Sequence, residues 1–97
     1  MIQLYSKKMQ GLSVIICCYN SAKRLPVTLE YLARQEVEPG INWEIIIVDN
    51  NSKDETAQIA NHFARSIAMV PCTVVSEPNP GLSHARQKGI DTARYEY

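Results

Sequence analysis

The sequence predicts an α/β fold in which three parallel strands alternate with three helices. The run Ile45–Val48 contains no polar residue and is mostly β-branched, which is typical of a strand covered on both faces of a parallel sheet. The stretch Leu12–Cys18 has the same plan, an apolar run followed by polar groups. Segments with a helical spacing of apolar residues follow both stretches. The chain therefore reads as strand, crossover helix, strand, the repeating unit of a doubly wound sheet.

The first helix is expected to begin between Ser21 and Pro26, because proline suits the first turn of a helix, where its missing N–H is not needed. Apolar residues then recur at a helical spacing until the breaker at 38–40. This stripe consists of Leu25, Leu29, Leu32 and Ala33. We expect it to pack against the sheet.

The second helix is expected to start near Ser52, since Ser52 and Glu55 match the S-x-x-E capping box. A third, shorter strand is expected at Cys72–Ser76, followed by a proline- and glycine-rich loop and a third helix at about 81–94. Small residues on the third helix would let it lie close to the sheet. The apolar stripes are Thr56, Ile59 or Ala60, Phe63 and Ile67 on the second helix, and Leu82, Ala85, Gly89, Ile90 and Ala93 on the third.

Composition excludes several classes of partner. Ten basic and ten acidic side chains give a formal net charge of zero, so nothing indicates a nucleic-acid partner or a polybasic membrane patch. No stretch approaches the roughly 18 apolar residues of a membrane span, and the first ten residues lack the apolar core of a signal peptide. We therefore expect a cytoplasmic protein with reduced cysteines. The spacing of these cysteines is not that of metal ligands. Residues 1–11 are expected to form a leader or flexible N-terminus, and residues 12–97 one small domain.

Polar residues follow both long strands. Tyr19 and Asn20 come after the first, and Asp49 and Asn50 end the second. Ligands in open α/β sheets bind beyond the carboxyl ends of the strands, so these residues would line one crevice. The Asp49 carboxylate would accept a hydrogen bond from a base or a ribose hydroxyl, or would merely order the turn before the second helix. Asn20 and Ser52 are most simply helix caps.

Two further side chains have alternative roles. Tyr19 would stack on a nucleobase, or would be a half-buried aromatic at the rim. Arg86 would bind a phosphate with its guanidinium fork, or would be a solvated helix residue paired with Glu77 or Asp91. The glycine-rich motifs of dinucleotide-binding folds and of P-loop hydrolases are absent from the sequence, so neither function is predicted.

Four segments together resemble the nucleotide-binding half of family 2 glycosyltransferases, which have the Rossmann-like GT-A fold. Each segment is short, but they occur in the order and spacing of the family. The matching residues are Ser13-Val14-Ile15-Ile16-Cys17-Cys18-Tyr19-Asn20, Leu25-Pro26-x-Thr28-Leu29, Glu44-Ile45-Ile46-Ile47-Val48-Asp49-Asn50-Asn51-Ser52-x-Asp54-x-Thr56 and Glu77-Pro78-Asn79-Pro80-Gly81-Leu82-Ser83-x-Ala85-Arg86. The resemblance covers about residues 12–97.

The resemblance implies a transferase that moves a sugar from a nucleotide-diphosphate donor to an acceptor, with a divalent cation (Mg or Mn) on the pyrophosphate. Residues matching Cys17, Tyr19, Asp49 and Asn50 would hold the nucleoside, and Arg86 would lie towards the base or the phosphates. Many relatives carry a second acid where this chain has Asn50, and an Asn where it has Gln87. The resemblance therefore does not distinguish between uridine, thymidine and guanosine as the nucleoside, because the amide of Asn50 can donate a hydrogen bond as well as accept one.

A further departure is that no D-x-D metal motif occurs in the sequence. The family also places its acceptor site and catalytic base beyond this region, so we expect a partial GT-A domain that is truncated before the D-x-D motif and is inactive alone. In the family's arrangement the next strand would lie beside Leu12–Cys18, so truncation would leave that strand as an open edge, and a homo-oligomer could form through it. The alternative is a stand-alone α/β binding or interaction module without catalysis.

Overall fold

The computed structural model describes residues 11–35, 40–67 and 70–95. The strands and helices alternate as predicted, and all strand pairs are parallel in the order β1-β2-β3. The elements are β1 (Leu12–Cys18), α1 (Leu25–Ala33), β2 (Trp43–Asp49), α2 (Thr56–Ser66), β3 (Cys72–Ser76) and α3 (Leu82–Thr92). The α/β fold class is thereby confirmed. The expected leader lies outside the described residues except for Gly11.

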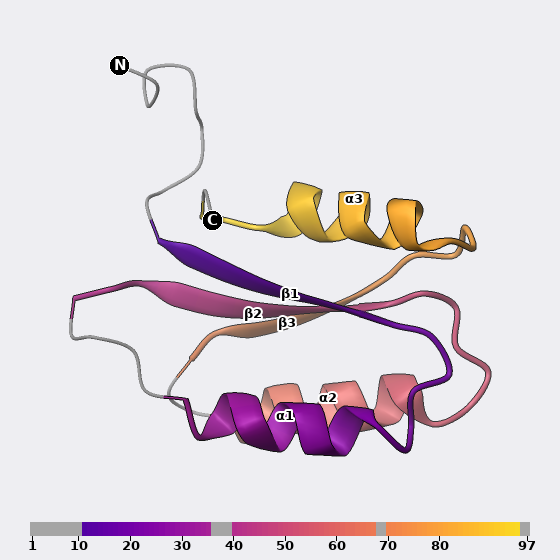
Figure 1. The fold of residues 1–97 in the computed structure, drawn as a ribbon, viewed down its shortest axis with the longest axis horizontal. Helices are drawn as coiled ribbons and strands as arrows, with labels where there is room; N and C mark the ends of the chain where they lie inside the picture. The colour runs from indigo at the N-terminus through magenta and orange to yellow at the C-terminus, as the bar shows by residue number, and fades with distance from the viewer. Residues whose placement is uncertain (1–10, 36–39, 68–69, 96–97) are drawn as a thin grey trace.

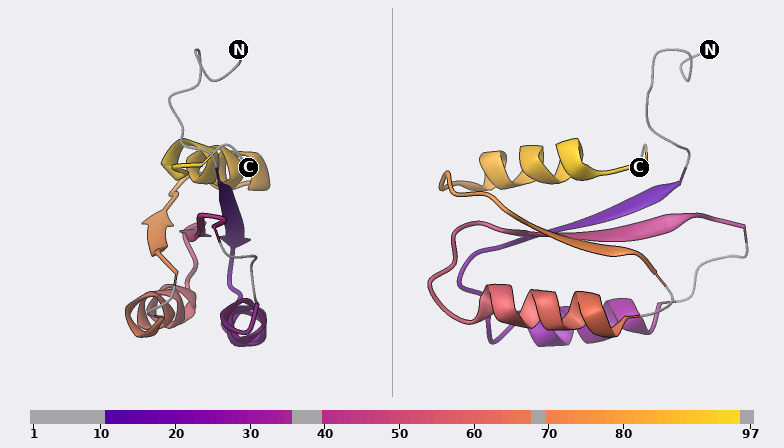
Figure 2. Two further views of the ribbon diagram at one scale, coloured as in Figure 1. Left: turned by 90° about the vertical axis from the view of Figure 1, so that its left-hand side faces the viewer. Right: turned by 180° about the vertical axis from the view of Figure 1, so that it is seen from behind.

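The domain has three layers. The sheet separates α3, on one face, from α1 and α2, on the other (Figure 1). The end-on view shows the same order of layers, with the three strands between the single helix and the pair (Figure 2). Two successive right-handed crossovers that run in one direction along a sheet place both helices on the same face. The chain then crosses to the opposite face, where α3 packs on β1 and β2.

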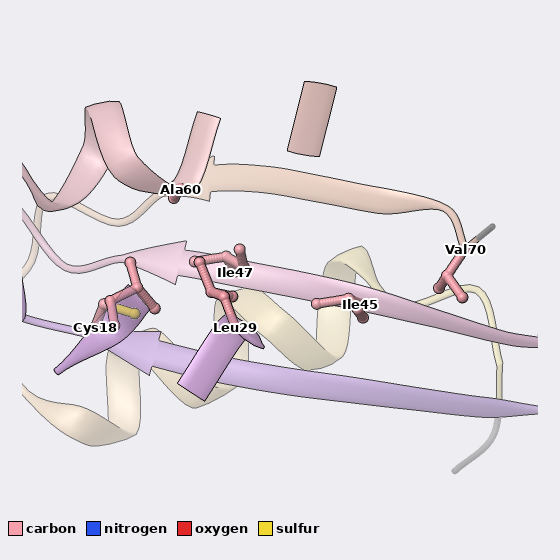
Figure 3. Packing of buried hydrophobic residues seen from close by; sticks show 7 residues of the cluster. Cys18, Leu29, Ile45, Ile47, Ala60 and Val70 are labelled. Atoms are coloured by element: carbon pink, nitrogen blue, oxygen red, sulfur yellow. The ribbon is translucent and has the colours of Figure 1, made fainter. Parts of the chain in front are cut away.

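The core forms around β2, the central strand. Ile45 to Val48 are fully buried, as their unbroken apolar run predicts. Alternate residues face opposite layers: Ile45 and Ile47 pack with α1 and α2, whereas Ile46 and Val48 pack with α3. Figure 3 shows Ile45 and Ile47 beside Leu29 of α1.

The predicted stripe of α3 is only partly correct. Ala85, Gly89 and Ala93 are buried against the sheet, but Leu82 is 53% exposed and Ile90 is 49% exposed. The reason is the position of β1, which has a strand neighbour on one side only within the described residues. Both side chains line a hollow together with Ile15 and Cys17 of β1.

Neither cap predicted from the sequence forms, since the N-cap residues are Arg24 for α1 and Glu55 for α2. α1 begins at Leu25, inside the expected window, and Leu25 and Leu29 are buried, although Ala33 is exposed. α2 begins at Thr56, and its N-cap residue, Glu55, makes no side-chain capping bond. The predicted capping box at Ser52 is therefore wrong. The Ser52 hydroxyl instead accepts a hydrogen bond from the Asn20 backbone N–H.

Glu44, near the start of β2, links β1 to the segment that follows α3. Its side chain is 3% exposed, and its Oε2 atom accepts hydrogen bonds of 2.7 Å from the Ser13 hydroxyl and from the Arg94 backbone N–H. The Arg94 guanidinium adds an ion pair at 3.5 Å to Oε1. The segment after α3 is thus fastened across β1 and β2. No helix in the described part of the chain is long and apolar enough to cross a membrane.

Candidate nucleotide-binding site

A pocket of about 460 Å³ opens at the carboxyl ends of the strands. It is bounded by three segments: the end of β1, the loop after β2, and the loop that leads into α3. The residues that line it are Cys17, Cys18, Tyr19, Asn50, Asn51, Lys53, Pro80, Gly81, Leu82 and Ala85. A pocket therefore exists at the predicted strand ends, and a third segment completes its wall. Of the four residues expected to line it, Tyr19 and Asn50 do so, whereas Asn20 and Asp49 do not.

The loops after β1 and β2 are bound to each other. The Asn20 N–H donates to the Ser52 hydroxyl at 2.9 Å, and the Asn20 side-chain oxygen accepts from the Lys53 N–H at 2.7 Å. The Ser21 N–H donates to the Thr56 hydroxyl at 2.8 Å. Asn20 has a left-handed backbone with φ of 46°, which asparagine tolerates better than most residues. Asn20 and Ser52 therefore join two loops instead of capping helices.

Asp49, the last residue of β2, is 9% exposed and does not line the pocket. Its Oδ1 atom accepts a hydrogen bond of 3.2 Å from the Ser52 N–H. That contact matches the turn-ordering role considered from the sequence. The other carboxylate oxygen makes no hydrogen bond within residues 11–35, 40–67 and 70–95, so it remains available as an acceptor.

Asn50 is buried, and its side-chain amide is bound to the loop before α3. The Nδ2 atom donates to the backbone carbonyl oxygens of Glu77 at 2.8 Å and Asn79 at 2.7 Å. The Oδ1 atom accepts from the Gly81 N–H at 3.2 Å. Asn50 thereby connects the end of β2 to the start of α3, across the pocket wall.

Tyr19 and Cys17 both line the pocket, Tyr19 as its place after the first strand predicted and Cys17 as the family resemblance implied. Tyr19 is 58% exposed, so its ring is accessible to a ligand. Burial raises the pKa of the Cys17 thiol, and the nearby Arg86 guanidinium opposes that rise. Burial, with smaller contributions from Asp49 and Cys17, raises the pKa of Cys18 to about 11. Both thiols are therefore protonated at neutral pH and can act as weak donors.

Arg86 lies in an adjoining hollow and not in the pocket. The hollow, of about 420 Å³, shares Cys17 and Leu82 with the pocket. Neither candidate acid holds the Arg86 guanidinium in the described structure: Asp91 accepts from Gln87, and Glu77 accepts from the Asn79 N–H. The solvated ion pair considered from the sequence is therefore not formed, and the guanidinium remains available for a ligand.

Lys53 is a pocket residue that the sequence analysis missed. It lines the pocket beside Asn51, and the Asn20 side chain fixes its backbone. The signal available in the sequence was its place three residues after Asn50, in the loop that follows a central strand. Among the described residues, no three His, Cys, Asp or Glu side chains lie together in a way that could hold a metal ion.

Comparisons with known proteins identify the family. A family model described as glycosyl transferase family 2 matches residues 13–97. The dolichyl-phosphate beta-glucosyltransferase of Homo sapiens is 33% identical over 99 residues, which cover 96% of this chain and 31% of the relative. The cholesterol galactosyltransferase of Borreliella burgdorferi is 35% identical over 85 residues, which cover 88% of this chain and 22% of the relative. The chain thus spans less than a third of these relatives.

Solved structures agree with the sequence comparisons. The crystal structure of S. aureus TarS 1-349 aligns with a TM-score of 0.76 and 29% identity, over 90% of this chain and 25% of that one. The same protein in complex with UDP-GlcNAc aligns with a TM-score of 0.73 and 30% identity, over 90% of this chain and 24% of that one. The chain therefore belongs to glycosyl transferase family 2 and contains part of the GT-A fold that its sequence predicted.

Proposed function

We propose that this chain is the donor-binding part of an enzyme that transfers a sugar from a nucleotide-diphosphate sugar to an acceptor hydroxyl. The observation that carries the proposal is the pocket itself. It lies at the carboxyl ends of two parallel strands and is lined by the exposed ring of Tyr19 and the cationic side chain of Lys53. The TarS complex with UDP-GlcNAc, at 30% identity, supports the ligand class. Residues 12–97 would form the N-terminal portion of the catalytic domain.

Five side chains in or beside the pocket have a proposed role. Tyr19 would stack on the base, because an exposed ring beside a pocket offers a flat apolar face. Asp49 would accept a hydrogen bond from the base or the ribose with its available oxygen. Cys17 would contact the nucleoside from the floor of the pocket. Arg86, in the adjoining hollow, would pair with the phosphates. Asn50 would hold the loop that forms one wall of the pocket.

A divalent cation is general in this family and would neutralise the leaving diphosphate. The described residues do not fit such an ion, because they bring no three candidate ligands together. We therefore assign no metal ligand and no catalytic base to them. A homo-oligomer through the open edge of β1 and a cytoplasmic location stay predictions.

Calorimetric titration tests this proposal. The chain is titrated with UDP, GDP and dTDP, each with and without manganese, and the series is repeated on Asp49→Ala. We expect base-selective binding that depends little on manganese and is lost in the variant. Asp91→Ala is the matched control, since it removes an exposed carboxylate on α3 that accepts a hydrogen bond from Gln87. A folded chain that binds none of the three nucleotides would contradict the proposal.

A further inference from the structure

We infer that Asn50 is a positioning residue, which shapes the nucleotide pocket by holding the 77–81 loop and the start of α3. This inference takes its ligand from the proposed function, but the hydrogen bonds that support it are present in the structure without a ligand. Three hydrogen bonds from one side-chain amide reach residues 27 to 31 positions further along the chain. Within the described residues, no other side chain from outside the 77–81 loop makes a hydrogen bond to it, and one backbone bond of 2.9 Å, from the Glu77 N–H to the Asp49 carbonyl, joins the start of the loop to β2.

The orientation of the Asn50 amide is fixed by its partners. Nδ2 lies 2.8 Å and 2.7 Å from two carbonyl oxygens, which can only accept hydrogen bonds. Oδ1 lies 3.2 Å from a backbone N–H, which can only donate. A flipped amide would bring an oxygen against both carbonyls. The site therefore requires a group with two donors and one acceptor, and among side chains of this size only asparagine supplies them.

The Asn50 amide has little capacity left for a ligand. Both Nδ2 hydrogens are directed to the loop, and the residue is 7% exposed. Its effect on a nucleotide would therefore pass through the segment that it holds. Pro80, Gly81 and Leu82 of that segment line the pocket.

The same contact controls where α3 begins. Gly81 adopts φ of 117° as the N-cap residue of α3, a conformation that favours glycine. Its N–H is bound by Asn50, and its carbonyl accepts the Ala85 N–H in the first turn of the helix. Arg86 follows Ala85 directly. Asn50 therefore sets the position of Arg86 as well as the wall of the pocket.

In this chain two carbonyl oxygens face the position, so an acid here would weaken the hold on the 77–81 loop. The carboxylate of Asn50→Asp would face the carbonyl oxygens of Glu77 and Asn79 at distances that suit a hydrogen bond, with no proton to share. The repulsion would raise the pKa of the new carboxyl group, because like partial charges disfavour its ionised form. Below that pKa the protonated acid could donate to one of the two carbonyls again. The loss should therefore be greatest at high pH and should diminish as pH falls.

The test uses two readouts on the wild-type chain, Asn50→Asp and Asn50→Ala. The first is hydrogen exchange of the Gly81 amide without nucleotide, corrected for the intrinsic rate at each pH. The second is the affinity for UDP. Asn50→Ala removes the three bonds without adding a charge, so it serves if the Asp variant does not fold. Asn61→Asp is the matched control, because its Nδ2 atom donates at 2.9 Å to the Ala57 carbonyl on the exposed face of α2.

We expect the Gly81 amide to exchange about tenfold faster in Asn50→Ala, and UDP to bind about tenfold more weakly in both Asn50 variants. In Asn50→Asp the affinity relative to wild type should recover between pH 8 and pH 5, while Asn61→Asp matches wild type throughout. Weaker UDP binding with unchanged Gly81 exchange would overturn the inference, since Asn50 would then contact the ligand itself. Faster exchange with unchanged affinity would also overturn it. If wild type binds no UDP, the proposed function fails, and the exchange of Gly81 alone decides whether Asn50 holds the loop.

Discussion

Gly89 of α3 lies against Ile15 of β1, so closely that a β-carbon at Gly89 would stand 2.4 Å from the Cγ2 atom of Ile15. The same β-carbon would lie 3.4 Å from Val48 of the central strand. The absence of a side chain at Gly89 is therefore what allows α3 to pack directly on β1 and β2. Because α3 carries Arg86 and one wall of the pocket, this contact also affects the site.

Gly89→Ala should lower the free energy of unfolding by roughly 1–3 kcal/mol, the usual cost of overpacking a core. This would occur even though alanine favours a helix over glycine by about 1 kcal/mol. In an Ile15→Ala background the obstructing methyl group is gone, so the same change should be neutral or stabilising. Urea unfolding of the four chains measures this coupling. An equal loss in both backgrounds would show that Ile15 is not the obstacle.

Glu44→Ala should lower the free energy of unfolding by about 3 kcal/mol, because it leaves the Ser13 hydroxyl and the Arg94 N–H without their buried acceptor. Arg94→Met should cost less than about 1 kcal/mol, since the Arg94 side chain is 57% exposed and its ion pair is partly solvated. Denaturant unfolding of both variants gives the comparison. Equal losses would mean that the ion pair, and not the two hydrogen bonds, carries the contact.

Stability should fall at alkaline pH through the partly buried thiol of Cys72. Burial raises the pKa of Cys72 from 9.0 to about 11, so the folded state binds more protons than the unfolded state between these values. The stabilisation is complete below pH 9 and is lost as pH rises towards 11. Cys72→Ser removes this titration, so its urea midpoint should fall less steeply between pH 8.5 and 11 than that of wild type. Parallel curves would contradict the assignment.

Arg86→Gln should weaken binding of UDP about tenfold and leave binding of uridine nearly unchanged, since the guanidinium is proposed to contact only the phosphates. Arg65→Gln provides the control, as it removes the same charge from the exposed last turn of α2. Calorimetry with both ligands separates the two contributions. An equal loss for UDP and uridine would place Arg86 at the nucleoside instead.

The elements of the fold were predictable because their signals are local. The unbroken apolar run at Ile45–Val48 and the third strand at Cys72–Ser76 depend only on neighbouring residues, and both are confirmed. The capping box at Ser52 failed because its hydroxyl is taken by Asn20, 32 residues away. Leu82 and Ile90 were expected in the core because helical periodicity predicts which residues share a face of α3. It does not predict whether the sheet is wide enough to cover that whole face.

The candidate site shows the same division between local and distant information. Tyr19 was predicted to line the crevice, since strand ends meet at one edge of a parallel sheet, whereas Cys17 was expected at the site only from the family resemblance. The role of Asn50 was not visible, because its three partners lie in a loop whose path is set only when β3 pairs with β2. From the sequence, Glu44 was identified only as the first residue of the segment at 44–56 that resembles the family. Its contact with Arg94, 50 residues further on, needs the complete three-layer fold.

The most direct test of the account is to map the amide chemical shifts of the chain during titration with UDP. If the strand-end pocket binds the nucleotide, the shifts should concentrate in the three segments that line it, at 17–19, 50–53 and 80–85, and should leave the exposed faces of α1 and α2 unchanged. Shifts that concentrate between α1 and α2, or no shifts at millimolar UDP in a folded chain, would contradict the assignment of this pocket as the nucleotide site.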